Sequence, residues 1–391
     1  MIKISTAGGY DQLVYTDLPE CNYTEGANIG IEKIDSSDCV VVATHACGVN
    51  YADCIIRWGL YKSAKDLVGW PITPGFEFSG TITHVGENVT DYKIGDKVAG
   101  VSLFGSYSKR IQVPAYQIRH VPENISMSEA AGFLTVGLTA HYAIFELCKL
   151  RKGDYVLVHS AAGGVGSMLV QMLKNKIGCH VVGVVGQTHK VEMAKQLGCD
   201  DVIDKSTQDL WSTAADLTVN GYKAIFDANG VETLQQSYNN LARGGRLVTY
   251  GYATMMPKSS EVSSGAIKTT DWMKLLWKYK TTPTFNPLDM TSENKSVMAF
   301  NLSYMFNEKE LLKELFTGLF QWISDGSLKV AKVTEFLMSD AGGAHRALES
   351  GSTVGKLVLL TEGDKPIQEM EVEENKNEGK NHVESDETKL L

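Results

Sequence analysis

The sequence has 391 residues, 43% hydrophobic and 21% charged, which is ordinary for a globular protein and too long for one hydrophobic core. The net charge of −9 argues against nucleic-acid binding, because phosphates are bound by an excess of basic residues. Seven cysteines without a CxxC pair favour a reducing compartment. With no signal peptide and no long apolar stretch, a cytoplasmic protein is expected.

Residues 1–125 contain short apolar runs separated by turn residues. The candidate strands are Met1–Ile4, Cys39–His45, Phe78–Val85, Lys97–Val101 and Arg110–Val113. Because most of this segment lacks helical periodicity, it is expected to form a small β-rich domain.

From Ser128 the pattern changes to apolar runs that alternate with helical segments. The first helix is predicted over Ser128–Leu147. Strands are predicted at Tyr155–His159, His180–Val185, Val202–Ile203, Ala224–Asp227, Arg246–Tyr250 and Val297–Leu302, and helices at Gly166–Asn175, Lys190–Leu197 and Thr233–Leu241. Such alternation predicts an α/β fold with a doubly wound parallel sheet of the Rossmann type. A helix over Leu311–Ile323 and a strand over Lys356–Leu360 are predicted to follow.

A glycine-rich turn follows the strand Tyr155–His159. Its residues are Ala161, Ala162, Gly163, Gly164, Val165 and Gly166, with alanine at 161 where the GxGxxG pattern has its first glycine. Backbone N–H groups at the start of the following helix favour a pyrophosphate. The turn therefore predicts dinucleotide binding; the alternative is a tight turn needed only for packing.

The end of the next strand indicates which dinucleotide is bound. NAD-preferring proteins hold the ribose hydroxyls with an acidic residue there. This chain instead runs from Val184 through Thr188 to Lys190 without a carboxylate, and Lys205 follows the third strand. NADPH is therefore predicted, with Thr188 as a further cofactor-binding residue and with Lys190 and Lys205 as partners of its 2′-phosphate. The alternative for Lys190 is an exposed lysine at a helix start.

Several ordered motifs carry a resemblance to a known family. They are Cys47–Asp53, Pro74–Glu77, Gly95–Val98 and the turn Ala161–Gly166. Together they resemble the quinone-oxidoreductase-like medium-chain dehydrogenases, and within these the synaptic vesicle membrane protein (vesicle amine transport protein) homologues. The narrower resemblance rests on Leu157–Ala161, Asn286–Leu288, Glu293–Lys295 and the acidic tail.

The resemblance implies a split domain organisation. A GroES-like substrate domain would combine residues 1–125 with 305–362, and a Rossmann cofactor domain would span 126–304 with an insert at about 252–290. The relatives pair through the last strand of the Rossmann sheet, which implies a homodimer. Residues 363–391 are expected to be a disordered acidic tail, either a solubilising extension or a binding segment.

The same comparison implies a reductase without zinc. Zinc-dependent relatives have a cysteine ligand where this chain has Asn50 and a histidine ligand where it has Phe76, and neither side chain present is a usual zinc ligand. Without a Lewis acid, the natural reaction is hydride transfer from NADPH to an activated acceptor, a quinone or an α,β-unsaturated carbonyl.

Further site residues follow from the resemblance, position by position. Asn50 matches a residue beside the nicotinamide ribose and is a candidate catalytic residue, and Thr139 matches one at the domain junction. Tyr61 matches one of two tyrosines near the substrate and is a candidate proton donor, whereas Ile55 stands at the other tyrosine position. The remaining matches line the cofactor cleft: Asn229, Gly251, Phe300 and Lys356. The alternative for Lys356 is a lysine at a strand edge with its stem packed on apolar surface.

The insert contains an amphipathic helix within residues 268–280. Trp272, Met273, Leu275, Leu276, Trp277 and Tyr279 lie on one side, and Lys274 and Lys278 on the other. Such a helix is typical of peripheral membrane contact, here with vesicles or the mitochondrial outer membrane, or of a cap over an apolar cleft. The alternative is a helix packed on its own domain or on a dimer partner.

Two functions remain open at this point. The first is a zinc-independent, NADPH-dependent reductase of quinones or enones. The alternative is a peripheral membrane-trafficking or lipid-handling protein that keeps NADPH as a structural or regulatory ligand. The missing second tyrosine and the amphipathic helix favour the alternative.

Overall fold

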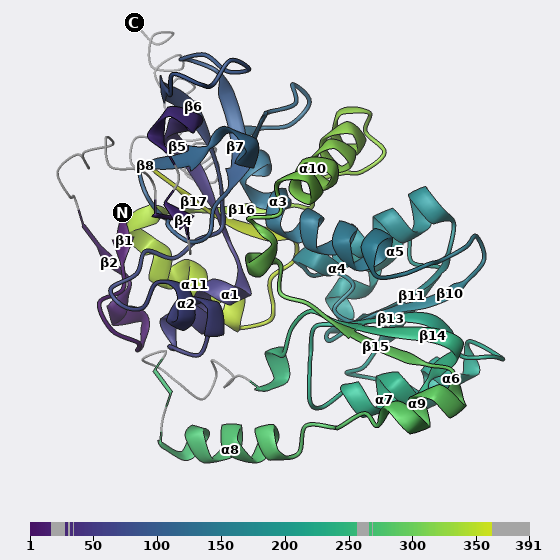
Figure 1. Cartoon of the computed structure of the whole chain (residues 1–391). Coiled ribbons are helices and arrows are strands. Elements are labelled where there is room, and N and C mark those ends of the chain that lie inside the picture. Colours follow the sequence, from purple (N-terminus) through teal and green to yellow (C-terminus); the bar gives the residue numbers. More distant parts are fainter. Residues whose placement is uncertain (17–27, 30–31, 34, 256–265, 268, 362–391) are drawn as a thin grey trace, which may run out of the picture.

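The computed structural model describes residues 1–16, 28–29, 32–33, 35–255, 266–267 and 269–361, so the expected acidic tail lies outside the described residues. Two sheets organise the chain into two lobes, with the mixed sheet in one and a parallel sheet in the other (Figure 1). The fold class expected from the sequence, a Rossmann domain beside a β-rich GroES-like domain, is confirmed.

The sheet of the β-rich lobe has seven strands in the order β16-β17-β5-β6-β7-β9, with β8 paired to β5. Its strands are β5 (Cys39–Val49), β6 (Glu77–Val85), β7 (Lys97–Val101), β8 (Arg110–Pro114), β9 (Ile118–His120), β16 (Val333–Leu337) and β17 (Lys356–Leu360). The antiparallel pairing of β17 with β5 sets Leu357 opposite Val49. The last described strand therefore returns to the N-terminal sheet.

The parallel sheet has six strands in the order β12-β11-β10-β13-β14-β15. They are β10 (Tyr155–Val158), β11 (His180–Val185), β12 (Asp201–Asp204), β13 (Tyr222–Asp227), β14 (Leu241–Thr249) and β15 (Ser296–Ala299). This is the strand order of dinucleotide-binding folds. Its connecting helices are α4 (Gly164–Met172), α5 (Val191–Leu197), α6 (Leu210–Asp216) and α7 (Leu234–Asn239). The strand β15 forms one edge of this sheet. The homodimer expected to pair through this strand stays a prediction.

Two helices that the sequence patterns did not reveal follow β5. They are α1 (Tyr51–Arg57) and α2 (Lys62–Leu67). Asn50 caps α1, and the Asp53 carboxylate accepts a hydrogen bond from the Asn50 backbone N–H at 2.8 Å. The reciprocal pattern Asn-x-x-Asp is a helix-start signal that was present in the sequence. Among the described N-terminal residues, β1 (Ile2–Lys3) pairs antiparallel with β2 (Val14–Tyr15), and β3 (Asn28–Ile29) pairs antiparallel with β4 (Glu32–Lys33).

The helix α3 (Met127–His141) joins the two lobes. It starts at a capping box formed by Ser126 and Glu129, and it contacts β5, β6 and β17 on one side and α4 on the other. The helix α10 (Lys309–Ser324) packs on α3, and α11 (Ala341–Glu349) packs on β17. The insert contains α8 (Thr269–Lys280) and α9 (Pro287–Glu293). Of the helices in the described part of the chain, none combines the length and apolar character needed to cross a membrane.

His141, the last residue of α3, predicts an acid sensitivity of the fold. Its ring stacks on Trp322 of α10, with centroids 5.2 Å apart, and burial lowers the pKa of His141 from 6.5 to about 4. Between these two pH values His141 binds a proton in the unfolded chain but not in the folded chain, so the free energy of unfolding falls as the pH falls. His141→Phe keeps a stacking ring and is expected to lose less stability on acidification than the wild type. Urea unfolding at neutral pH and near pH 5 measures this; equal losses would contradict it.

Candidate functional site

The glycine turn between β10 and α4 is closely packed. Ser160 has a left-handed backbone (φ 55°), and its carbonyl accepts the Gly163 N–H at 2.8 Å. A Cβ on Gly166 would lie 2.1 Å from the Ser160 carbonyl oxygen, so only glycine fits there. The departure at Ala161 is accommodated by Gly183 of the neighbouring strand, where a Cβ would lie 2.9 Å from the Ala161 methyl group. The turn thus keeps its tight geometry with alanine in its first position.

A cavity of about 210 Å³ lies beside this turn and carries two cations. Lys190 and Lys205 both line it, together with Ser160, Ala162, Gly163, Val184, Val185, Gly186, Asn229 and Gly351. The Lys190 ammonium donates a hydrogen bond to the Gly351 carbonyl at 2.6 Å, and burial lowers the pKa of Lys190. Gly351 belongs to the segment between α11 and β17, so the β-rich lobe closes one side of this cavity.

One carboxylate near this cavity was not expected from the sequence. Asp204, at the end of β12, accepts hydrogen bonds from the Thr188 hydroxyl at 2.6 Å and from the Ser206 N–H at 2.9 Å. A hydrogen bond from the Ser206 hydroxyl is the main cause of the lowered pKa of Asp204. Neither Asp204 nor Thr188 is among the residues that line the cavity. The charge facing the cavity is therefore positive.

A second cavity, of about 540 Å³, lies at the junction of the two lobes and is mostly apolar. Val165 forms part of the wall of this second cavity, and it follows closely after Gly163, which lines the first cavity. Aromatic side chains dominate the lining: Tyr51, Tyr61, Phe76, Tyr250, Tyr252, Phe300 and Phe306. Of the residues expected at the nicotinamide end, Asn50, Tyr61, Thr139, Gly251 and Phe300 line it. We call this cavity the aromatic cleft.

A buried ion pair lies behind Asn50. The Lys356 ammonium is 2.8 Å from the Glu77 carboxylate, and both side chains are almost fully buried. The Asn50 amide joins the pair, since its Nδ2 donates to Glu77 at 2.8 Å and its Oδ1 accepts from Lys356. Glu77 also accepts the Thr135 N–H of α3 at 2.9 Å. The pair therefore fixes the orientation of Asn50.

The hydroxyl groups of the aromatic cleft differ in their hydrogen bonding. Tyr61 donates to the Asn301 side-chain oxygen at 3.1 Å and lies 3.2 Å from the Ser303 hydroxyl; burial raises its pKa. The Thr139 hydroxyl donates to the Thr135 carbonyl at 2.7 Å. The Thr135 hydroxyl is buried, and no partner for it is found in the described residues. Thr135, one helical turn before Thr139, is therefore an unsatisfied polar group on the cleft wall that sequence reasoning missed.

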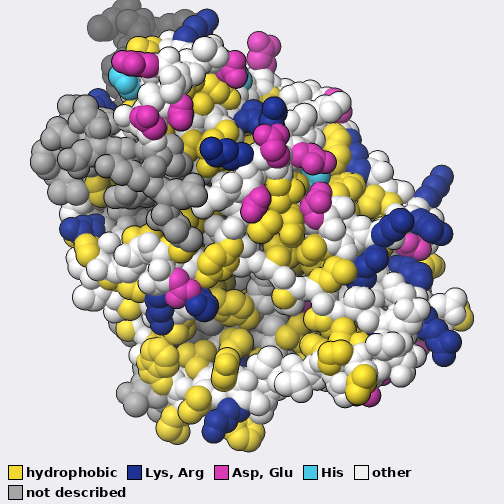
Figure 2. Space-filling view, viewed as in Figure 1, with side chains coloured by type: hydrophobic (Ala, Val, Ile, Leu, Met, Phe, Trp, Pro, Cys, Tyr) yellow, Lys and Arg dark blue, Asp and Glu magenta, His cyan; other side chains and the backbone are white. Residues whose placement is uncertain are grey.

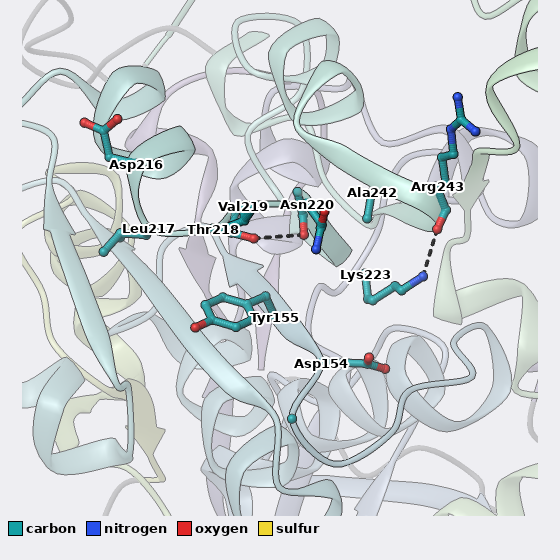
Figure 3. A pocket seen from close by; sticks show the side chains of 12 residues that line it. Asp154, Tyr155, Asp216, Leu217, Thr218, Val219, Asn220, Lys223, Ala242 and Arg243 are labelled. Carbon is teal, nitrogen blue, oxygen red and sulfur yellow. Dashed lines mark hydrogen bonds between the residues drawn. The ribbon is translucent and has the colours of Figure 1, made fainter.

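A third cavity, of about 760 Å³, lies at the opposite edge of the parallel sheet, where β10 and β13 begin (Figure 3). Figure 3 shows the Lys223 ammonium directed to the Arg243 carbonyl. The Thr218 hydroxyl donates to the Gly221 carbonyl. None of the predicted site residues lines this cavity. Ligands of such sheets bind at the carboxyl ends of the strands, so this cavity is not the cofactor site.

Five of the predicted cofactor residues do not line either of the first two cavities. Ala161 is fully buried and donates its N–H to Val184, and Lys356 is held in the ion pair; the others are Gly164, Gly166 and Thr188. The sequence also missed Asn301, Ser303 and Gly351, which the structure places against Tyr61 and Lys190. These partners come from distant parts of the chain and have no local signature.

Comparison with known proteins agrees with this architecture. The model of the alcohol dehydrogenase GroES-like domain matches residues 36–149, and that of zinc-binding dehydrogenases matches residues 164–309. A probable quinone oxidoreductase of Schizosaccharomyces pombe is 33% identical over 329 residues, 83% of this chain and 89% of the relative. The synaptic vesicle membrane protein VAT-1 homolog of Danio rerio is 32% identical over 85% of this chain, which spans 65% of that relative. The structure of Escherichia coli quinone oxidoreductase complexed with NADPH has a TM-score of 0.74 at 26% identity, covering 92% of this chain and 99% of that chain.

A Rossmann sheet and a GroES-like domain with a cleft at their junction define the medium-chain class of dehydrogenases and reductases. Within this class the chain belongs to the quinone oxidoreductase family of oxidoreductases. It is also similar to the VAT-1 homologs.

Proposed function

We propose that the protein is a zinc-independent, NADPH-dependent oxidoreductase that reduces quinones or α,β-unsaturated carbonyls. The observation that carries this proposal is the pair of cavities at the start of α4, one with two lysines and one lined by aromatic rings. Relatives named quinone oxidoreductase and 2-haloacrylate reductase support the substrate class, and neighbouring structures complexed with NADPH support the cofactor.

The residues present fit a dinucleotide phosphate. Gly163 leaves a cradle beside the turn, where an added Cβ would meet the Ser160 carbonyl at 3.1 Å, and the N-terminus of the nine-residue helix α4 follows. Backbone N–H groups there would hold the pyrophosphate. Lys190 and Lys205 would hold the 2′-phosphate, and Asn229 lines the same cavity. Asn50, Thr139, Gly251 and Phe300 would surround the nicotinamide, which supplies a hydride when NADPH is bound.

The residues present do not fit zinc. Asn50 and Phe76 offer an amide and a phenyl ring where a metal would need nitrogen, sulfur or carboxylate ligands. Glu77, the nearby carboxylate, is already neutralised by Lys356 at 2.8 Å. Among the described residues, Cys54, His345 and Glu349 form a cluster with metal-binding side chains, but the Arg57 guanidinium lies 2.7 Å from Glu349 and supplies its positive charge. Hydride acceptance is therefore proposed without a Lewis acid.

The proton that completes the reduction has two sources in this proposal, Tyr61 or solvent. Burial raises the pKa of Tyr61, so its hydroxyl keeps its proton at neutral pH. Its present partners, Asn301 and Ser303, orient the hydroxyl within the aromatic cleft. Ile55, which also lines the cleft, offers no second hydroxyl.

Cofactor discrimination is expected to depend on Lys190 and Lys205. Replacing either with alanine removes one cation facing the 2′-phosphate, and a hydrogen bond to a charged group contributes about 1.5–3 kcal/mol, or tenfold or more in affinity. The KM for NADPH is expected to rise about tenfold per lysine, whereas the KM for NADH stays unchanged. Lys195→Ala, an exposed position on α5, is the matched control. An equal rise for NADH and NADPH would reject the assignment.

Turnover itself is tested by steady-state oxidation of NADPH with a panel of quinones and enones. We expect at least one acceptor to support oxidation, with a strong preference for NADPH over NADH. Tight NADPH binding without turnover on any acceptor would reject the enzyme and favour the alternative of a trafficking or lipid-handling protein that keeps NADPH as a structural ligand.

A further inference from the structure

Tyr252 lies on the wall of the aromatic cleft and is also exposed to solvent. Four tyrosines line this cleft, and Tyr252, at 36%, is the most exposed of them. The space-filling view shows hydrophobic side chains gathered around the hollow above α8 (Figure 2). Within the described part of the chain, no residue forms a hydrogen bond with the Tyr252 hydroxyl. This hydroxyl is therefore available to a molecule bound in the cleft.

The backbone of Tyr252 is fixed to segments of the proposed cofactor site. The Thr254 N–H donates to the Asn229 carbonyl at 2.7 Å, and Asn229 lines the lysine-lined cavity. Gly230 has a left-handed backbone (φ 92°), and a Cβ there would lie 2.9 Å from the Tyr252 Cα, so this close approach requires glycine. The preceding residue, Gly251, lines the aromatic cleft. Tyr252 thus stands at a fixed place beside the expected nicotinamide position.

The helix α8 supports the same turn through its polar side. The Lys278 ammonium donates to the Thr254 carbonyl and to the Glu232 carboxylate at 2.8 Å. The apolar side of α8 is exposed instead, with Trp272 at 50% and Trp277 at 69%. Packing of this apolar side on its own domain, one of the alternatives from the sequence, is therefore wrong, and membrane contact of α8 stays a prediction.

The other three tyrosines of the cleft are less able to exchange a proton with solvent. Tyr61 is 9% exposed, and its hydroxyl partner Ser303 is followed at 3.2 Å by the Ser63 hydroxyl, which is fully buried. Burial is also the main cause of the raised pKa of Tyr51 and of Tyr250. Proton exchange between the cleft and solvent is therefore easiest through Tyr252.

The acidity of Tyr252 suits a proton donor. Burial, followed by the nearby Tyr61 and Tyr304 phenols, raises the pKa of Tyr252 to about 12. The hydroxyl therefore keeps its proton at neutral pH, and a phenolate formed there readily takes up a proton from water.

We propose that Tyr252 is the catalytic acid of the aromatic cleft and passes a proton from solvent to the acceptor oxygen. This role rests on the proposed function and deepens it, because it names the group through which solvent supplies the proton. Within one cleft the acceptor meets Tyr252 from the Rossmann lobe and Tyr61 from the β-rich lobe. Since Tyr61 is already hydrogen-bonded to Asn301 and Ser303, its part is to hold the acceptor.

Tyr252 supplies the one proton that the hydride does not. The acceptor takes a hydride, and with it two electrons, from NADPH, which is oxidised to NADP⁺. Negative charge then develops on the acceptor oxygen. The O–H bond of Tyr252 breaks as a new O–H bond forms on that oxygen, and the phenolate recovers a proton from water, to which Tyr252 is exposed.

Tyr252→Phe removes the hydroxyl and keeps the ring, so it tests the role directly. With an enone as acceptor, kcat is expected to fall about a hundredfold, since a general acid contributes about 10²–10⁴-fold, and the KM for NADPH is expected to stay unchanged. The loss is expected to be smaller with an electron-poor quinone, because the oxygen of its reduced form is less basic. Tyr304→Phe is the matched control: this nearby phenol is 47% exposed but does not line the cleft, and wild-type rates are expected.

Three results would overturn the role of Tyr252. They are a wild-type kcat in Tyr252→Phe, a loss of the same size in Tyr304→Phe, and equal losses of Tyr252→Phe with the enone and with the quinone. The last result would mean that the variant has lost packing rather than an acid. Thermal unfolding of both variants checks that they are folded.

A wild type that oxidises NADPH with no acceptor would instead reject the proposed function and, with it, catalysis by Tyr252. The contact between Tyr252 and a carbonyl oxygen is then decided by binding. Acetophenone, a ketone without an activated double bond, is titrated in the presence of NADP⁺, so that no hydride is available. Tyr252→Phe is expected to weaken its binding about fivefold, and equal affinity in wild type and variant would reject the contact.

Discussion

Replacing Gly166 with alanine is expected to weaken NADPH binding by about tenfold or more. The added Cβ would lie 2.1 Å from the Ser160 carbonyl oxygen and 2.9 Å from the Ala161 Cα, and both are backbone atoms that cannot rotate away. The turn must therefore open, which displaces the N–H groups at the start of α4; overpacking of this kind costs about 1–3 kcal/mol. Fluorescence titration with NADPH measures the loss.

Two further glycine substitutions separate damage to the fold from damage to the site. Gly342→Ala in α11 is the control, because its Cβ would meet the Tyr10 Cβ at an ordinary 3.6 Å. Gly163→Ala adds a methyl group at the wall of the lysine-lined cavity with a milder contact of 3.1 Å, so it is expected to fold and yet to bind NADPH less tightly. Wild-type affinity in both Gly163→Ala and Gly166→Ala would show that the cofactor is not bound at the turn.

Replacing Lys356 with methionine is expected to destabilise the protein by about 3–5 kcal/mol. The change leaves the Glu77 carboxylate fully buried with hydrogen bonds from Asn50 and Thr135 but without its counter-ion. A loss of this size is a large fraction of the ~5–15 kcal/mol that stabilises a typical folded protein. Urea unfolding at neutral pH gives the difference in the free energy of unfolding.

A surface pair and a double variant serve as controls for this prediction. Lys62→Met breaks the pair with Asp66, in which the lysine is 78% exposed, and about 0–1 kcal/mol is expected. Adding Glu77→Gln to Lys356→Met removes the unpaired charge and should recover most of the stability. If Lys356→Met lowered the free energy of unfolding as little as Lys62→Met, the Lys356–Glu77 pair would have to be solvated. Lys356 lines neither cavity, so a loss of NADPH affinity in the double variant is expected to act through Asn50, which the pair orients.

The structure gives Lys356 a different role from the one that the sequence predicted. Lys356 was expected at the cofactor, because related chains have a cleft residue at this position. In the structure, β17 pairs antiparallel with β5, with Leu357 opposite Val49, and this register carries Lys356 to Asn50. A hydrogen-bonded pairing between residues some 300 positions apart depends on the whole sheet, so no local pattern reveals it.

Which side of the helix α8 faces the protein could likewise not be predicted from the sequence. Its amphipathic pattern was evident in the sequence, because helical periodicity separates Trp272 and Leu276 from Lys274 and Lys278. Which side faces the protein is decided by its partners Glu232 and Thr254, from other segments. In the described structure the polar side is the anchored one, contrary to the usual arrangement.

The sequence by itself determined the alternation of strands and helices, the position of the glycine turn and the lysines near it. These features depend on steric and hydrophobic patterns within about ten neighbouring residues, and such patterns act before any tertiary contact forms. The tertiary structure alone decided that Glu77 meets Lys356 behind Asn50, that Thr135 is left unsatisfied on the cleft wall, and that α8 exposes its aromatic face. Each of these depends on which groups from distant parts of the chain the packed sheets bring together, and a buried polar group finds a partner only where that packing supplies one.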